Sequence, residues 1–245
     1  MRLANSSQIE TDEMRELDLP ILSETLGRIP YGRVILAMYD PDSQYSSLLI
    51  NISAAHLKAG GDLLYIVSSK PTTEVRQQFN DLGVNVAEYE AKDNAVLFDA
   101  YSAQMGVKSS EKYQSSTSNL NELSITITQS APQWPSGTLV IVESYSNMAF
   151  NQENMFVKFW RRVAGVWRTR GTVMIVGLAL DLHPSQFYQE MKLVSDGAFE
   201  VKLREDRGEI INTMRARSMK GQSSDTRLRQ ILFDNKMKAS LRMLE

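Results

Sequence analysis

The chain has 245 residues, of which 42% are hydrophobic and 23% are charged, a composition typical of folded globular proteins rather than disordered ones. Its formal charge of −2 creates no overall field that would attract nucleic acid or an anionic membrane, so such a contact would need a local patch. The sequence has no cysteine, which excludes disulfides and thiolate chemistry, and its two histidines are too few for a histidine metal cluster.

The N-terminal residues 1–20 are polar and lack the continuous apolar stretch of a signal peptide or membrane anchor. Longer apolar runs elsewhere, such as residues 139–142, are too short to cross a bilayer. We therefore expect a cytoplasmic protein that makes no membrane contact.

Runs rich in Val, Ile and Leu predict strands that are buried on both faces, because their apolar residues are continuous rather than alternating. Segments with helical spacing lie between these runs. In chain order, the predicted strands are residues 34–38, 63–67, 139–142 and 173–177, and the predicted helices are residues 47–59, 73–82, 154–168 and 184–194. This alternation predicts an α/β fold with three layers, in which helices flank a mostly parallel central sheet.

The remaining segments carry weaker signals. Residues 103–119 are rich in Ser, Lys and Gln, which favours a long mobile loop. Residues 199–221 contain two strand-like runs around Gly208 and predict antiparallel C-terminal strands beside the parallel sheet. The basic, amphipathic residues 223–245 predict a terminal helix.

The turn after the first predicted strand carries the most informative pattern. It reads Tyr39-Asp40-Pro41-Asp42-Ser43-Gln44-Tyr45-Ser46-Ser47 and leads into an apolar helix. This arrangement resembles the phosphate-binding loop of KaiC-like proteins, a branch of the RecA-like P-loop ATPases, whose usual form is Gly-x-Pro-Gly-x-Gly-Lys-Thr/Ser-Thr. When Pro41 is placed on the family proline, Tyr45 stands at the lysine and Ser46 and Ser47 stand at the hydroxyl pair.

Other segments resemble the same family in the same order. Residues 139–146 are similar to the Walker B strand, with Glu143 in the acidic place, and residues 194–200 are similar to the family's Ala-Asp-Gly segment. A loose likeness to its Lys-Met-Arg-Gly strand follows at residues 214–221. The resemblance implies an N-terminal extension over 1–22, a RecA/KaiC-like domain over 23–222 and a basic C-terminal helical tail over 223–245.

The departures from the family pattern bear on function. A working loop uses glycines so that backbone amides can surround phosphate oxygens, and a lysine that bonds the outer phosphates. Here Tyr39, Asp42 and Gln44 replace the glycines and Tyr45 replaces the lysine. Loss of one charged hydrogen bond costs about 1.5–3 kcal/mol, or roughly ten- to a hundredfold in affinity. After the second strand, residues 68–70 are Ser, Ser and Lys where the family usually has the catalytic glutamates.

These departures predict a degenerate Walker A loop and a pseudo-ATPase without catalytic residues. The candidate nucleotide-binding residues are Asp42, Ser43, Gln44, Tyr45, Ser46, Ser47 and Glu143. A simpler interpretation is that Ser46 and Ser47 only cap a helix and that Pro41 and Asp42 form an ordinary turn. A further interpretation is that weak binding of ATP and Mg²⁺ survives, or that an active ATPase uses a lysine or arginine from another segment or subunit.

Residues 158–170 interleave aromatic side chains with arginines, as some single-strand nucleic-acid sites do. At helical spacing, however, Phe156, Trp160, Val163 and Trp167 fall on one stripe with the arginines largely off it, which favours a helix docked on the sheet. Our main hypothesis is a regulatory or assembly subunit in a homo-oligomer, or in a hetero-oligomer with a RecA-like relative. Nucleic-acid binding by this helix and the basic tail is the less favoured alternative.

Overall fold

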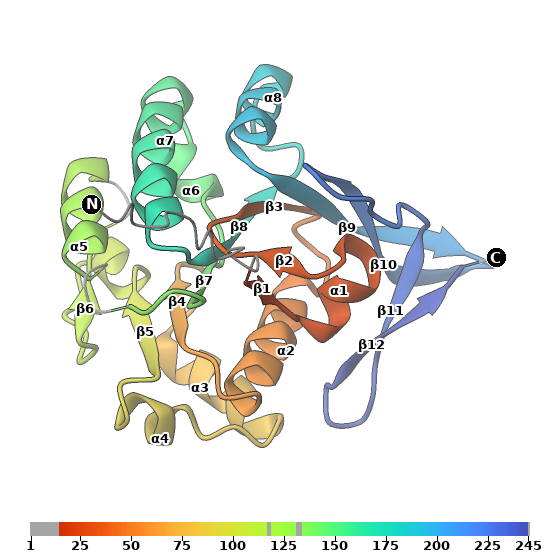
Figure 1. Ribbon diagram of the computed structural model, residues 1–245, viewed down its shortest axis with the longest axis horizontal. Helices are drawn as coiled ribbons and strands as arrows, with labels where there is room; N and C mark the ends of the chain where they lie inside the picture. Colours follow the sequence, from red (N-terminus) through yellow and green to blue (C-terminus); the bar gives the residue numbers. More distant parts are fainter. Residues whose placement is uncertain (1–14, 117–118, 131–133, 245) are drawn as a thin grey trace, which may run out of the picture.

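The computed structural model describes residues 15–116, 119–130 and 134–244. Within these residues a central sheet lies between two layers of helices (Figure 1). The helices are α1 (Pro20–Leu26), α2 (Tyr45–Lys58), α3 (Thr72–Asp81), α4 (Val86–Glu90), α5 (Leu120–Ser130), α6 (Ser146–Ala149), α7 (Glu153–Thr169) and α8 (Ser185–Val194), with a 3-10 turn at Ser102–Met105.

The sheet has ten strands in the order β12-β11-β10-β9-β3-β8-β7-β4-β5-β6. Strands β3 to β9 pair in parallel, including the short edge strand β6, whereas β9, β10, β11 and β12 pair antiparallel. Their bounds are β3 (Val34–Tyr39), β4 (Leu63–Val67), β5 (Ala95–Asp99), β6 (Tyr113–Gln114), β7 (Leu139–Val142), β8 (Val173–Ala179), β9 (Gly197–Asp206), β10 (Glu209–Met219), β11 (Arg229–Phe233) and β12 (Ala239–Met243). This arrangement confirms the predicted three-layer α/β fold, with a mostly parallel central sheet and antiparallel C-terminal strands.

Alternate residues of the central strands contribute to two separate hydrophobic cores. On β3, Ile35 and Ala37 pack with helices α1 to α4, whereas Val34, Leu36 and Met38 pack with α5 to α8. All five side chains are buried, which explains why the strand reads as a continuous apolar run. The four predicted strands and the four predicted helices are all present, with ends that differ by at most two residues.

The predicted helical tail is wrong. Residues 229–243 form the hairpin β11–β12, which extends the sheet beyond β10. The turn is fixed by Asp234, whose carboxylate accepts hydrogen bonds from the amides of Lys236 and Lys238, and by the left-handed backbone of Met237. Asn51 on α2 holds the hairpin in place, since its amide donates to Met237 O and its oxygen accepts from the Ala239 amide. Pairing with the open edge of β10 therefore outweighs the helical spacing of the tail.

The N-terminal boundary also differs from the expectation. Of the predicted extension, residues 1–14 lie outside the described residues. A small sheet joins β1 (Glu16–Leu17) to β2 (Ile29–Pro30), and α1 crosses the proposed boundary at residue 22 and buries Leu22 and Leu26 against the same core. Residues 15–22 therefore pack as part of the domain.

The segment predicted to be a long loop, residues 103–119, is irregular over most of its described length but is attached to the body. The side chain of Ser109 is hydrogen-bonded to Asp99 at the end of β5, and Gln114 accepts a hydrogen bond from the Ser109 amide. Arg76 on α3 forms ion pairs with Glu90 and Glu111. Helix α5, which follows this segment, was not predicted.

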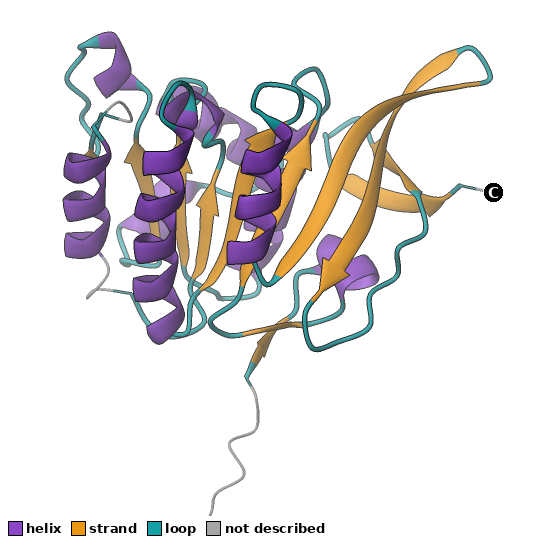
Figure 2. Ribbon diagram, turned by 90° about the horizontal axis from the view of Figure 1, so that it is seen from above, coloured by secondary structure: helices purple, strands orange, loops and turns teal. Residues whose placement is uncertain are grey.

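The longest strands, β9 and β10, form a twisted ribbon that continues past the helices at one end of the sheet (Figure 2). Among the described residues, no helix combines the length and apolar character that crossing a bilayer requires.

Candidate functional site

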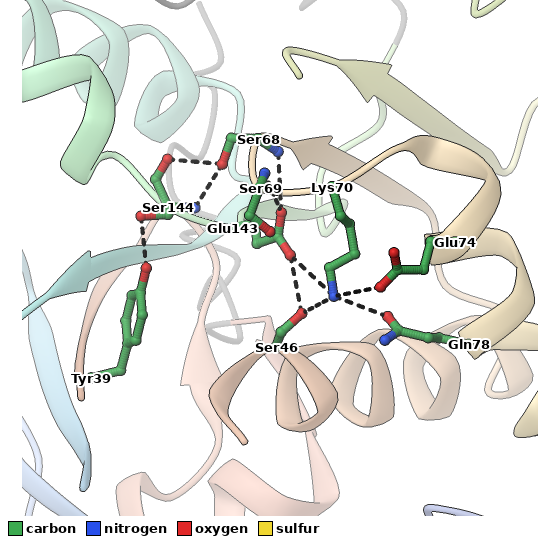
Figure 3. A network of polar contacts seen from close by, with 9 residues as sticks. All are labelled: Tyr39, Ser46, Ser68, Ser69, Lys70, Glu74, Gln78, Glu143 and Ser144. Atoms are coloured by element: carbon green, nitrogen blue, oxygen red, sulfur yellow. Dashed lines mark hydrogen bonds and ion pairs between the residues drawn. The ribbon is translucent and has the colours of Figure 1, made fainter. Parts of the chain in front are cut away.

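The carboxyl ends of the parallel strands β3, β4 and β7 meet at one edge of the sheet, where ligands of open α/β sheets usually bind. The turn from β3 into α2, the residues after β4 and the residues after β7 contribute the side chains of the site (Figure 3).

The turn after β3 is held by hydrogen bonds within the protein. The amide of Ser43 donates to Asp40 O at 2.9 Å, which closes a tight turn with Pro41 next to its start. Asp40 Oδ2 accepts from the Leu203 amide at 2.8 Å, and Asn212 Oδ1 accepts from the Gln44 amide at 2.7 Å. The expectation of an ordinary turn at Pro41 and Asp42 is thus confirmed.

None of residues 40–47, all of which the structure describes, has a left-handed backbone conformation. Concave anion-binding loops alternate right- and left-handed residues so that successive amides point at one ligand. This turn therefore does not form such a concavity.

The hydroxyl groups of Ser46 and Ser47 do not act as the N-cap of helix α2. Helix α2 begins at Tyr45, and its N-cap residue Gln44 makes no side-chain capping bond. The Ser46 hydroxyl instead donates to Glu143 Oε1 at 3.0 Å, and the backbone oxygen of Ser47 accepts from Asn51 at 2.9 Å. The helix-cap interpretation of Ser46 and Ser47 is therefore wrong.

Tyr45, at the place of the family lysine, points into the core rather than toward solvent. Its side chain is buried, and its ring stacks on Tyr39 with centroids 4.1 Å apart and planes 10° apart. Its hydroxyl has no hydrogen-bond partner among the described residues and lies beside Gly177 on β8. Burial raises the pKa of Tyr45 well above 10.0, and the nearby Tyr39 and Glu143 add to the rise.

Glu143, at the end of β7, is the buried carboxylate of the site, with 2% of the residue exposed. Its Oε2 accepts hydrogen bonds from the amides of Ser68 and Ser69, both at 3.1 Å, and its Oε1 accepts from Ser46. Buried charges need such partners, because desolvation of an unpaired carboxylate is costly. The structure thus brings Ser46 and Glu143, two candidates that the sequence analysis named separately, into contact.

Lys70, just after β4, supplies the positive charge of the site. Its Nζ donates to Ser46 Oγ at 2.7 Å and to Gln78 Oε1 at 3.3 Å. It also lies 3.8 Å from Glu143 Oε1 and 3.9 Å from Glu74 on the next helix. The sequence analysis interpreted Lys70 only as the replacement of a catalytic glutamate. A lysine at the end of one predicted strand and a predicted buried carboxylate at the end of another are a signal for an ion pair.

Three further side chains extend the network away from Lys70. The Ser68 hydroxyl donates to Ser144 O, and the Tyr39 hydroxyl donates to Ser144 Oγ at 2.7 Å. Burial raises the pKa of Tyr39 and the charge of Glu143 raises it further, while the hydrogen bond to Ser144 works in the opposite direction. Sequence analysis did not identify this Tyr39–Ser144–Ser68 connection, because it depends on which strands are neighbours.

The other predicted loop residues do not join this network. Asp42 and Gln44 are exposed, and Ser43 donates its hydroxyl to Asp40 O within the turn. Among the described residues, no group of three or more His, Asp or Glu side chains is arranged to hold a metal ion.

The aromatic and basic helix α7 packs as its stripe predicts. Phe156, Trp160 and Trp167 are fully buried against the sheet, so these rings are not available to stack on nucleic-acid bases.

Comparison with known proteins identifies the family of this chain. The family model described as "ATPase: KaiC" matches residues 14–236. The chain belongs to the KaiC ATPase family. A KaiC-like protein from the hyperthermophilic archaeon Pyrococcus horikoshii superposes with a TM-score of 0.73 at 12% sequence identity, with 94% of this chain and 99% of that chain covered. At that identity the likeness shows a shared fold, and no curated protein matches the sequence.

The shared fold gives this KaiC-family chain the two strand ends at which P-loop proteins hold nucleotide. It retains a hydroxyl on the loop and an acidic side chain after β7, and these two residues are in contact. It differs at the glycines and at the lysine of the loop, where the Gln44 amide donates to Asn212 and the Tyr45 ring stacks on Tyr39.

Proposed function

We propose that this chain is a KaiC-family subunit that does not hydrolyse ATP and that acts as a regulatory or assembly subunit through protein–protein contacts. The observation that carries the proposal is the position of Tyr45. A lysine at this point of a P-loop reaches the outer phosphates, whereas the Tyr45 side chain is buried, with its ring stacked on Tyr39 and its hydroxyl beside Gly177.

Two further observations support the absence of turnover. The turn amides of Ser43 and Gln44 already donate to oxygens of the protein, so they would have to exchange these bonds for bonds to phosphate. The strand β4 is followed by Ser68, Ser69 and Lys70 rather than by a carboxylate that could orient an attacking water. We infer that the residues present do not fit a bound magnesium nucleotide.

Support for a contact function comes from the surface. Several large apolar side chains are exposed, among them Ile210 at the tip of the β9–β10 ribbon (75% exposed), Leu193 on α8 (73%) and Met155 on α7 (61%). Exposed apolar side chains are common singly. Ile210, however, is the second residue of β10, and the β9–β10 ribbon extends beyond the helices (Figure 2), where another protein can reach it. A homo-oligomer and an assembly with a RecA-like relative both fit this arrangement.

The test of catalysis is a phosphate-release assay with Mg-ATP on the full chain, combined with isothermal titration. We expect no release above background and no saturable heat at micromolar nucleotide. The matched control is Glu143→Gln, which removes the charge at the Walker B position. Turnover by the unaltered chain that disappears in Glu143→Gln would refute the proposal, whereas activity that persists in this variant comes from a contaminant.

One observation favours a second candidate, weak nucleotide binding. Lys70 brings an ammonium group within 2.7 Å of Ser46 on the loop, and a lysine from another segment could contact a phosphate there. In that case, Lys70→Met would abolish the heat of ATP binding. Under the main proposal, the titrations of the unaltered chain and of Lys70→Met are both flat.

A further inference from the structure

The positive charge beside Glu143 is the side-chain ammonium group of Lys70. Lys70 Nζ, Ser46 Oγ and Glu143 Oε1 form a connected group in which the ammonium donates to the hydroxyl and the hydroxyl donates to the carboxylate (Figure 3). The side chain of Lys70 is 14% exposed and that of Glu143 is 3% exposed, so the pair is largely removed from solvent. Such a pair interacts more strongly than one on the surface.

The two oxygens of this group are spaced like neighbouring ligands of a magnesium ion. Ligands of Mg²⁺ lie about 2.0–2.1 Å from the metal in octahedral geometry, which places adjacent ligands roughly 2.9 Å apart. Ser46 Oγ and Glu143 Oε1 are 3.0 Å apart. In P-loop proteins these two positions hold the metal ion. Here the ammonium of Lys70 donates to Ser46 Oγ at 2.7 Å and lies 3.8 Å from Glu143 Oε1.

We propose that Lys70 is the resident cation of this site and that it excludes divalent metal ions from Ser46 and Glu143. This inference rests on the proposed function, because a chain that turned over Mg-ATP would have to admit the metal. The ammonium compensates the buried carboxylate and repels a second cation that approaches the same oxygens.

The surroundings of Lys70 fix its position. Gln78 Oε1 accepts a hydrogen bond from Nζ at 3.3 Å, and Glu74 lies 3.9 Å away on the same helix. Without the ammonium, the oxygens of Glu143, Ser46, Gln78 and Glu74 would surround a space lined by hard ligands. Oxygen ligands of this kind suit Mg²⁺ and Mn²⁺.

The experiment is a titration of the nucleotide-free full chain with Mn²⁺, in which the free ion is followed by electron paramagnetic resonance. The variants are Lys70→Met, which removes the charge at similar length, and Lys70→Met combined with Glu143→Gln. Lys58→Met is the matched control, since it removes one positive charge from the far end of α2, where Lys58 is hydrogen-bonded to Leu82 O. Circular dichroism establishes that each variant is folded.

We expect Lys70→Met to bind one equivalent of Mn²⁺ at least about tenfold more tightly than the unaltered chain. The Lys58→Met variant should behave like the unaltered chain, and the double variant should lose the gained site. Should Lys70→Met fail to fold, Lys70→Gln provides the same loss of charge with a polar end.

Two results would overturn the inference. One is a folded Lys70→Met or Lys70→Gln variant that binds Mn²⁺ no better than the unaltered chain. The other is an unaltered chain that already binds one equivalent of Mn²⁺ and loses it in Glu143→Gln. Either result without ATP turnover leaves the proposed function standing, whereas turnover in the phosphate-release assay refutes the proposed function itself.

Discussion

Tyr45 is a residue whose ring and hydroxyl have different roles. The buried ring stacks on Tyr39, whereas the hydroxyl lies beside Gly177 on β8 and has no hydrogen-bond partner among the described residues. A buried hydroxyl without a partner lowers stability because its desolvation is not compensated, while loss of a buried aromatic ring leaves a cavity.

We therefore predict that Tyr45→Phe leaves the free energy of unfolding unchanged or raises it by about 1 kcal/mol. Tyr45→Ala should lower it by about 3–5 kcal/mol. Tyr45→Lys, which restores the family residue, should also destabilise the chain and should give no ATP turnover, because Asp42 and Gln44 still occupy the glycine places. Urea denaturation and phosphate release measure these effects, and a stable, active Tyr45→Lys variant would contradict them.

Asp99 gives a prediction about pH. Burial alone would raise the pKa of this carboxyl, but hydrogen bonds from the Ser109 and Ser102 side chains and from the Ser102 and Tyr101 amides outweigh it and hold the pKa below 3.8. A carboxyl whose pKa is lowered by folding stabilises the protein above its unfolded pKa, and this contribution is lost as the pH falls through the folded value.

Asp99→Asn should therefore reduce the free energy of unfolding by about 1–3 kcal/mol at pH 7. The difference from the unaltered chain should shrink below about pH 4, where the carboxyl of the unaltered chain also becomes neutral. Urea denaturation from pH 7 down to pH 2 measures the difference. If the difference in the free energy of unfolding stayed constant from pH 7 to pH 2, the charge of Asp99 would not be what holds the chain segment after β5.

At the scale of elements, β8 passes so close to the site that one position accepts no side chain. A Cβ on Gly177 would lie 2.1 Å from Glu143 O and 2.6 Å from the Tyr45 hydroxyl. Gly165, in the middle of α7, offers a matched comparison because a Cβ there would meet nothing within 4 Å.

Gly177→Ala should lower the free energy of unfolding by about 1–3 kcal/mol or more through overpacking. Gly165→Ala should raise it by up to about 1 kcal/mol, since alanine favours helix more than glycine does. Thermal denaturation of both variants gives the comparison. Equal effects of the two substitutions would show that the close approach of β8 to Glu143 does not constrain the chain.

The helices and strands also show which parts of the fold could be predicted from the sequence. Continuous apolar runs predicted β3, β4, β7 and β8 because strands buried on both faces need apolar residues at every position. The tail was misjudged because an amphipathic pattern does not reveal an open strand edge at β10, and α5 was missed because polar residues surround it. In the site, the family pattern identified Ser46 and Glu143 as candidates but not their contact, and the role of Lys70 depends on β4 lying next to β7.

At the scale of the whole molecule, the chain presents a sheet that is covered by helices over its parallel part, with the β9–β10 ribbon extending beyond them (Figure 2). If the chain acts as an assembly subunit, its partner contacts should be independent of nucleotide. A substitution at the tip of the β9–β10 ribbon should weaken these partner contacts.

We predict that the native mass of the full chain, measured by native mass spectrometry, exceeds the 27.7 kDa of one chain and is unaffected by Mg-ATP. Ile210→Lys at the ribbon tip should shift the particle toward the single chain without loss of helical signal. The control is Val107→Lys, which places a charge at another exposed apolar position (57% exposed) outside the ribbon. If the unaltered chain is a monomer both alone and with a RecA-like relative, the assembly hypothesis is excluded.

The contact of Tyr45 with Gly177 limits how the sequence of this loop could change by successive substitutions. A single substitution that introduces lysine at position 45 places a charge in a space filled by a ring, and a single glycine at position 39 removes the ring on which Tyr45 stacks. Each of these steps would weaken the fold before any phosphate contact could form. Replacing this aromatic filling with the glycines and lysine of the family pattern would therefore require several coordinated substitutions.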